Sequence, residues 1–411
     1  MELSFPEGFL WGAAGSAHQI EGNNVASDLW ALENRPGSVM RERSGDACDS
    51  YHRWHEDLDI VRGLGLTAYR FSVEWARVEP VEGQISLAAL AHYRRVIEGC
   101  LERGLTPVVT LHHFTSPFWF QLAGGWLSGE AVARFRRYVR AVLPILDGVE
   151  WVCTINEPNM LAMVASIMNQ GGNGEGDGRE ERAENAAGAL PAPDPAVADA
   201  LAAAHRAARE ELGAAGLKSG WTVANQNFEA DGGAEAERDA WAWPREDRFL
   251  DVAAGDDFIG VQAYTRVRIG PEGALPVPEG ARRTLTGWEF YPQALGNAVR
   301  YTAARLPGVP ILVTENGVAT ADDAERVEYT RGALAGLHGA IADGIDVRGY
   351  LHWSLLDNYE WGSYRPTFGL VAVDRETFAR TVKPSARWLG GVARAGALPA
   401  GTAREEMSPV G

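Results

Sequence analysis

Apolar and β-branched residues form short runs along the chain, and these runs alternate with longer amphipathic stretches rich in Ala, Leu and Arg. Short runs of this kind predict buried strands, and the longer stretches predict helices. We expect eight strands, at residues 9–14, 67–73, 105–111, 151–156, 219–225, 258–264, 309–314 and 347–353. Helices are expected between most of them and after the last, for example at residues 87–103, 129–146, 195–212, 287–306, 322–343 and 384–395.

This alternation is typical of βα units around a parallel sheet. Eight such units predict an α/β fold, the (β/α)₈ or TIM barrel, in which reactive side chains stand on loops at the carboxyl ends of the strands. A doubly wound open sheet is the alternative, but no Gly-x-Gly-x-x-Gly turn follows the first strand to hold a dinucleotide phosphate. The pattern therefore favours one barrel with elaborated βα loops.

The domain organisation follows from composition along the chain. We expect one catalytic barrel domain over residues 1–398. Residues 171–195 are rich in Gly and then in Pro, which predicts a mobile loop that follows the fourth strand and overhangs the mouth of the barrel. Residues 399–411 are expected to form a disordered tail.

The charge balance limits the partners. The chain has 411 residues, with 38 Lys and Arg against 55 Asp and Glu, for a formal net charge of −17. Because this charge would repel polyphosphate backbones and anionic lipid, we expect no nucleic-acid and no membrane partner. The N-terminus lacks a basic segment followed by an apolar one, and no stretch reaches the roughly 18 apolar residues of a membrane span. The sequence thus predicts a cytoplasmic protein.

Cysteines are few and scattered, at positions Cys48, Cys100 and Cys153. They are too few for a disulfide framework, and no spacing of Cys and His resembles a zinc site. The sequence therefore predicts a reducing compartment, with no bound metal and no cofactor.

Two glutamates stand at matching places in the predicted barrel. Glu157 follows the fourth strand, and Glu315 ends the seventh. An isolated glutamate at such a place is usually a solvated loop residue. Two glutamates at strand ends on different sides of the mouth, however, can flank a single bond of a bound substrate. Paired carboxyl groups in that arrangement are what glycoside hydrolysis requires, because one protonates the departing oxygen while the other meets the positive charge that builds on the sugar.

The segments around these glutamates carry a family resemblance. The chain has Thr-x-Asn-Glu-Pro at residues 154–158 and Thr-Glu-Asn-Gly at residues 314–317. Further matching segments follow the same order, at residues 5–12, 19–22, 69–72 and 353–361. With these motifs the sequence resembles the family 1 glycoside hydrolases, a β-glucosidase-like family, over roughly residues 5–390.

The resemblance implies a retaining, exo-acting β-glycosidase. Such an enzyme releases a terminal, non-phosphorylated sugar from a small-molecule or oligosaccharide β-glycoside through a covalent glycosyl-enzyme intermediate. Glu315 would be the nucleophile and Glu157 the acid and then the base, with Arg70 lowering the pKa of Glu315. The resemblance also implies sugar-binding roles for Gln19, His113, Asn156 and Glu360 at ring hydroxyls, for Tyr264 at the nucleophile, for Trp353 as the floor and for Trp361 as a further polar contact.

The chain departs from the family pattern at several places. Gln262 stands where the family commonly has Asn, and His18 stands where Tyr is frequent. Phe114 and Thr115 replace a frequent Trp-Asp pair. Because of these changes, the sequence does not determine which sugar is the glycone. The presence of Glu360 argues against a 6-phosphate, and we expect the nearby Arg365 to be a solvated loop residue.

Three points stay open from the sequence. Aromatic residues after the third strand either line the leaving-group side or pack the loop; they are Trp119, Phe120 and Trp126. A transglycosidase would share every residue named above, and an inactive sugar-binding barrel is the non-enzyme alternative, although it would normally have lost one carboxylate. The oligomeric state cannot be read from the sequence.

Overall fold

The computed structural model of the chain describes residues 2–38, 40–171 and 191–399. The predicted tail at residues 399–411 lies outside the described residues except for its first residue, and so does most of the predicted loop at residues 171–195. The predicted disorder of these two segments stays a prediction.

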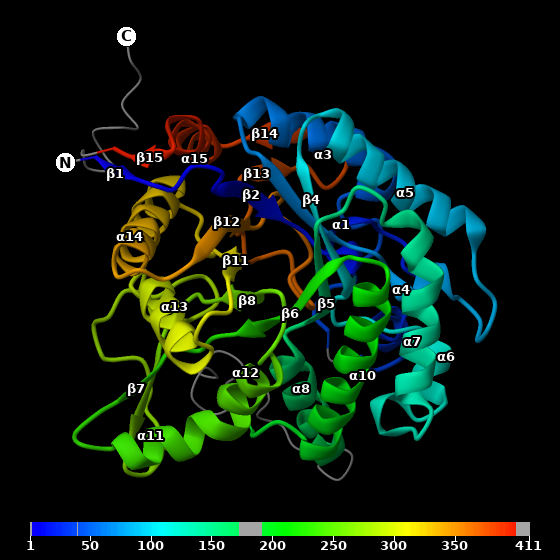
Figure 1. Cartoon of the computed structure of the whole chain (residues 1–411), viewed down its shortest axis with the longest axis horizontal. Helices are drawn as coiled ribbons and strands as arrows, with labels where there is room; N and C mark the ends of the chain where they lie inside the picture. The colour runs from blue at the N-terminus through cyan, green and yellow to red at the C-terminus, as the bar shows by residue number, and fades with distance from the viewer. Residues whose placement is uncertain (1, 39, 172–190, 400–411) are drawn as a thin grey trace.

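The eight predicted strands close into a parallel barrel in chain order (Figure 1). The barrel strands are β2 (Leu10–Ala14), β3 (Ala68–Ser72), β4 (Thr106–His112), β5 (Trp151–Asn156), β6 (Lys218–Ala224), β8 (Ile259–Gln262), β11 (Ile311–Asn316) and β12 (Val347–Trp353). Each differs from its predicted bounds by at most two residues at either end. The predicted (β/α)₈ fold is therefore confirmed, and the open sheet is excluded.

Side chains fill the interior of the barrel, as expected for this fold. One cluster of buried apolar side chains comes from the barrel strands and the residue before β8. It consists of Ala68, Val108, Trp151, Cys153, Phe258, Leu312 and Leu351. A larger apolar cluster contains residues of both the strands and the helices around them. Because the interior below is packed, an open site can form only at an end of the barrel.

Helices surround the barrel (Figure 1). They include α3 (Ser50–Leu64), α5 (Leu87–Glu102), α7 (Ala131–Val142), α10 (Pro195–Ala214), α12 (Arg248–Val252), α13 (Ala294–Arg305), α14 (Asp323–Ala342) and α15 (Pro384–Ala395). α5, α10 and α14 begin after Ser86, Asp194 and Asp322, whose side chains accept backbone N–H groups of the first turn.

Two predicted helices differ from the structure. The helix expected at residues 287–306 begins at Ala294, because Pro292 precedes it and the backbone before it pairs with another loop segment through Arg283 and Glu289. The helix expected at residues 129–146 is α7 followed by a 3₁₀ turn, η2 (Leu143–Ile145), which contains a proline.

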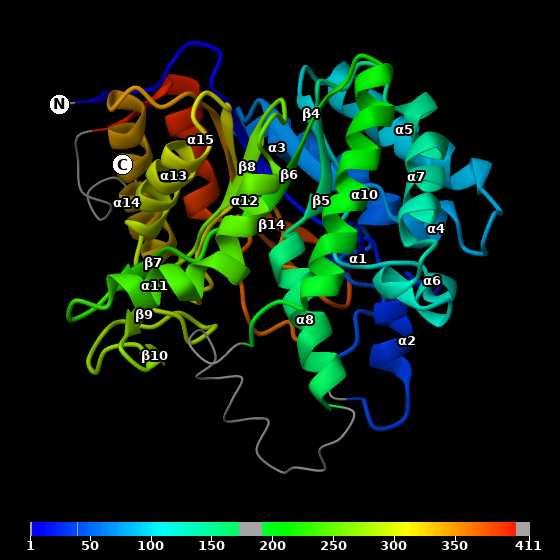
Figure 2. The same cartoon turned by 60° about the horizontal axis from the view of Figure 1, so that its bottom comes forward.

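Short elements also lie in the loops between the barrel strands and the helices that follow them (Figure 2). The helical ones include α1 (Ala17–Ile20), α2 (Asp28–Asn34), α4 (Trp75–Val78), α6 (Phe118–Leu122), η1 (Gly125–Leu127), α8 (Pro158–Gly171) and α11 (Glu235–Ala242). Small sheets add β7 (Phe228–Ala230), β9 (Val267–Gly270), β10 (Gly273–Ala274), β13 (Val371–Val373) and β14 (Arg380–Val382). Another short pair joins β1 (Leu3–Ser4) to β15 (Ala397–Leu398) near the two ends of the chain.

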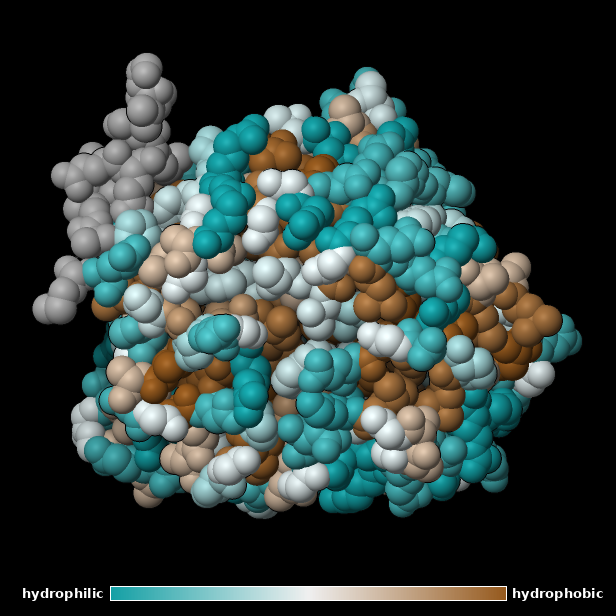
Figure 3. Space-filling view, turned by 45° about the horizontal axis from the view of Figure 1, so that its top comes forward, coloured by the Kyte–Doolittle hydropathy of each residue, from teal (hydrophilic) through white to brown (hydrophobic). Residues whose placement is uncertain are grey.

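The surface in Figure 3 shows apolar residues in separate patches between polar ones. Among the helices that the structure describes, none combines the length and the hydrophobicity of a transmembrane span. Within the same described residues, no group of three or more His, Cys, Asp or Glu side chains is placed to hold a metal ion.

Candidate active site

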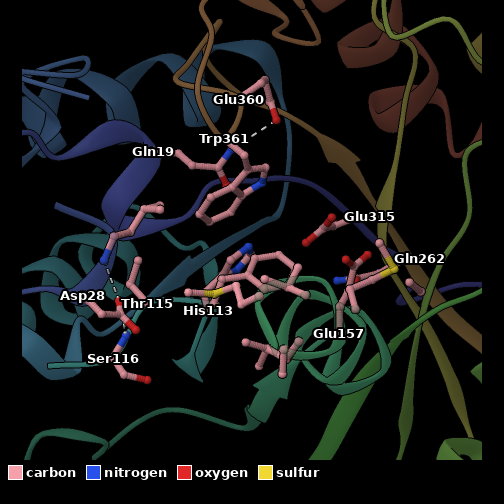
Figure 4. Close-up of a pocket in the computed structure, with 18 of the residues that line it drawn as sticks. Gln19, Asp28, His113, Thr115, Ser116, Glu157, Gln262, Glu315, Glu360 and Trp361 are labelled. Carbon is pink, nitrogen blue, oxygen red and sulfur yellow. Dashed lines mark hydrogen bonds between the residues drawn. The ribbon is translucent and has the colours of Figure 1, made fainter. Parts of the chain in front are cut away.

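A cavity of about 890 Å³ opens at the carboxyl ends of the barrel strands. Eight of the ten predicted site residues line it: Gln19, His113, Glu157, Tyr264, Glu315, Trp353, Glu360 and Trp361. The other two, Arg70 and Asn156, are fully buried and hydrogen-bond to residues of the lining. Figure 4 shows Glu157 and Glu315 facing the same space. The structure thus brings all ten predicted residues together.

Glu315 lies within β11, and two donors hold its carboxyl group. Arg70 Nη1 donates to Oε1 at 2.5 Å, and the Tyr264 hydroxyl donates to Oε2 at 2.7 Å. Burial raises the pKa of Glu315, and the charge and hydrogen bonds of Arg70 and Tyr264 oppose that rise. Both oxygens therefore have a donor that stabilises the ionised form.

Glu157 follows β5 directly and precedes α8. Its backbone has a φ of 43°, in the left-handed region that residues other than Gly and Asn rarely adopt. The chain turns sharply there, and the Glu157 N–H donates to the Thr222 carbonyl at 2.8 Å. Burial and the negative charge of Glu315 raise the pKa of Glu157 well above its ordinary value, against the opposing effect of Arg70. The two glutamates thus differ in their readiness to ionise.

Asn156 is held by three donors to the same oxygen. Arg70 Nη2, Gln262 Nε2 and the Thr222 hydroxyl donate to Asn156 Oδ1 at 2.5, 2.9 and 3.1 Å. This arrangement fixes the side-chain amide, because the opposite orientation would point its N–H groups at a guanidinium. Asn156 Nδ2 and Gln262 Oε1 are buried and have no hydrogen-bond partner among the residues that the structure describes.

A second group of polar side chains gathers around Glu360. Trp353 Nε1 donates to Glu360 Oε1 and Gln19 Nε2 donates to Oε2, both at 3.1 Å. Gln19 also donates to Asn358 and accepts from the Ser16 hydroxyl. Burial is the main reason that the pKa of Glu360 rises to about 8.

Aromatic rings cover the space between these two groups. The ring of His113 stacks on Trp353 and on Trp361, with centroids 5.9 and 6.2 Å apart and planes within 19° and 15°. Trp361 also stacks on His18, within 4°. Burial and Arg70 lower the pKa of His113 well below its ordinary value, so its imidazole is neutral.

Several contributing residues were not predicted from the sequence. Thr110 and Thr222 support Arg70 and Asn156 from below, while Ser16 and Asn358 hold Gln19. The signal available for Thr110 was its position next to the end of the predicted strand at residues 105–111, whereas Thr222 lies in the middle of the predicted strand at residues 219–225. Of the three aromatic residues left open, Trp126 lines the cavity, whereas Phe120 is fully buried and Trp119 donates to the Glu79 carbonyl.

A (β/α)₈ barrel with a pair of differently held carboxyl groups in one cavity is the arrangement that the glycoside-hydrolase class of barrel enzymes requires. The profile of glycosyl hydrolase family 1 matches residues 1–186 and 273–397. The chain belongs to this family. It is an O-glycosyl hydrolase, a β-glucosidase-like enzyme that hydrolyses β-glycosides.

Relatives and solved structures agree with this assignment. Beta-glucosidase A of Thermotoga maritima is 31% identical, over 95% of this chain and 98% of the relative. The solved beta-glycosidase BGL167 is 45% identical, with a TM-score of 0.85 over 97% of this chain and 98% of the other. The beta-glycosidase from Pyrococcus horikoshii is 34% identical, with a TM-score of 0.86 over 100% and 99% of the two chains.

Proposed function

We propose that the chain is an exo-acting, retaining β-glycosidase that releases one terminal, non-phosphorylated sugar. The observation that carries the proposal is that two carboxyl groups on one cavity have different surroundings, which favour different protonation states. Arg70 and Tyr264 favour the ionised form of Glu315, while burial and the charge of Glu315 favour the protonated form of Glu157. One nucleophile and one acid are what the first step of retention requires.

In the first half-reaction, Glu315 Oε attacks the anomeric carbon while Glu157 gives its proton to the leaving oxygen. The bond to the aglycone breaks, and a glycosyl ester forms on Glu315. The ester carries no negative charge. The charge of Glu315, which together with burial raised the pKa of Glu157, is therefore gone. Glu157, now a carboxylate, accepts a proton from the incoming water, which opens the ester and restores both groups.

The sugar would lie between the two polar groups, with its ring on the indole of Trp353. Donors and acceptors suited to ring hydroxyls are present in Gln19, Asn156 and Glu360, and Asn156 Nδ2 has no partner within the described part of the chain. A phosphate would need a cation, and among the described residues neither Lys nor Arg lines the cavity. Arg365 is exposed and lies outside the lining.

The configuration of the first product tests the mechanism. Proton NMR of a nitrophenyl β-glycoside digest should show the β-anomer of the free sugar first, followed by slow mutarotation. Glu315→Ala should lose activity by orders of magnitude and regain turnover with azide, which would give the α-glycosyl azide. Glu157→Ala should also lose activity. An α-anomer as first product, or near-normal turnover in either variant, would overturn the proposal.

A further inference from the structure

The part of the cavity formed by α2, η1 and α8 is predominantly apolar. α2 and α8 project beside each other from the same end of the barrel (Figure 2). With η1 and the segment after α2, they contribute the side chains of Leu29, Leu32, Met40, Leu127, Met160, Leu161, Val164, Ala165 and Met168. We call this set of nine residues the apolar wall.

α8 supplies most of the apolar wall. Leu161, Val164, Ala165 and Met168 recur at helical spacing, which places them along one side of the helix. Val164 is 43% exposed and Met168 52% exposed. Exposed apolar side chains that continue the lining of a cavity are typical of a ligand-binding groove.

Three polar side chains in this part of the cavity, those of Asp28, Thr115 and Ser116, are bonded within the protein. The Thr115 hydroxyl donates to Glu74 at 2.7 Å, and the Ser116 hydroxyl lies 2.9 Å from His112 Nε2. Asp28 Oδ1 accepts two backbone N–H groups. A second sugar ring would set most of its hydroxyls against the carbon atoms of the apolar wall, and unpaired hydroxyls disfavour binding.

The apolar wall lies where the leaving group must go. Glu157, which would protonate the departing oxygen, stands immediately before the first residue of α8. From Glu157 the helix rises for about 16 Å to Met168, at about 1.5 Å per residue. Apart from His113 and Asn156, the groups that would hold the ring hydroxyls and floor of the glycone, Gln19, Trp353 and Glu360, come from α1, the end of β12 and the loop after it. An aglycone attached to the departing oxygen would therefore extend along the apolar stripe of α8.

Resting on the glycosidase function proposed above, we propose that the preferred substrates are β-glycosides with an extended apolar aglycone, alkyl or aryl, and not oligosaccharides. Each methylene buried against the wall would contribute up to about fourfold in kcat/KM. A long alkyl aglycone should thus be favoured over a short one by tenfold or more, although the two leaving alcohols are chemically alike.

The wild-type chain tests this preference without mutation. Release of the free sugar is measured from the methyl β-glycoside, the octyl β-glycoside below its micelle concentration, and the β-linked disaccharide, all with the same glycone. We expect kcat/KM for the octyl glycoside to exceed both others by at least tenfold. A disaccharide cleaved as well as the octyl glycoside would overturn this inference but leave the glycosidase function intact. Failure to cleave any β-glycoside would overturn the function itself.

Variants on α8 identify the wall as the cause. Val164→Gln and Met168→Gln should each lower the ratio of octyl to methyl kcat/KM by about threefold to tenfold. Ile167→Gln is the matched control, because Ile167 lies on the same helix and is also 43% exposed but does not line the cavity. An unchanged ratio in both wall variants, or an equal fall in the control, would contradict the assignment.

Discussion

Gln262 Nε2 donates to Asn156 Oδ1 at 2.9 Å. Gln262 is the residue that stands where the family commonly has Asn. With Arg70 and Thr222 on the same oxygen, this bond leaves Asn156 Nδ2 as a donor that no described residue accepts from. Gln262 is in this sense a positioning residue, which acts on the sugar through Asn156.

Gln262→Leu should therefore lower kcat/KM by about twofold to tenfold, the usual loss for one hydrogen bond. Gln262→Asn, which keeps the amide, should lose less. The effect of Leu should vanish on the deoxy glycoside that lacks the hydroxyl bound by Asn156, so the two variants are compared over the 2-, 3-, 4- and 6-deoxy substrates. An equal loss on every substrate would instead indicate a purely structural role.

Much of the barrel could be predicted because each strand is one short, continuous run of buried residues. β5 and β12 match their predicted bounds, and β11 ends two residues later than predicted. The helix expected from residue 287 begins only at Ala294, because the preceding residues form a local antiparallel hairpin in which Arg283 pairs with Glu289 and the Phe290 N–H donates to the Arg282 carbonyl. Apolar periodicity alone does not distinguish the strand of such a hairpin from the first turns of a helix.

The site shows the same division. Glu157 and Glu315 could be predicted because they stand at strand ends in recognisable motifs. The shared acceptor on Asn156 could not, because Arg70, Thr222 and Gln262 come from three strands and meet only when the barrel closes. The apolar wall was missed because the helical stripe on α8 reads like an ordinary core-facing helix.

The pKa of Glu157 gives a prediction for pH dependence. Its raised pKa keeps the acid protonated at neutral pH, so kcat/KM should fall as the pH rises through that pKa. Removal of the Glu315 charge should lower the pKa of Glu157. A ¹³C NMR titration of the carboxyl carbons should show this in Glu315→Gln and in the wild type after a 2-fluoro glycoside has esterified Glu315.

Glu360 provides the control for this assignment, because burial raises the pKa of its carboxyl group too, to about 8. Glu360→Gln should lose activity but keep a basic limb in the pH profile. A profile that becomes flat at high pH in this variant would assign the limb to Glu360 instead of Glu157.

Dependence on metal ions can be tested directly. The sequence predicts no metal requirement, and the chemistry proposed for Glu157 and Glu315 uses protons and a covalent ester alone. Dialysis against a chelator should therefore leave kcat and KM unchanged for a nitrophenyl β-glycoside. Loss of activity that a divalent ion restores would contradict the proposed mechanism.

Arg70 carries the last prediction. Its guanidinium is fully buried and bonds Glu315, Asn156 and Thr110 at once. Arg70→Met removes the charge that opposes the rise in the pKa of Glu315, so the acid limb of kcat/KM should move to higher pH by about one to three units. Arg70→Lys keeps a charge but not the planar fork, and should shift the limb less.

Loss of a buried ion pair also costs stability, about 3–5 kcal/mol where one partner remains unpaired. Arg380→Met separates the two effects, because Arg380 forms a similarly buried pair with Asp57, at 2.9 Å, and neither residue lines the cavity. Both Met variants should unfold at lower denaturant concentration, measured by circular dichroism. Only Arg70→Met should move the acid limb, since only Arg70 touches the carboxyl group that must be ionised to attack. A shift of equal size in Arg380→Met would show that the limb reports global stability and not the charge state of Glu315.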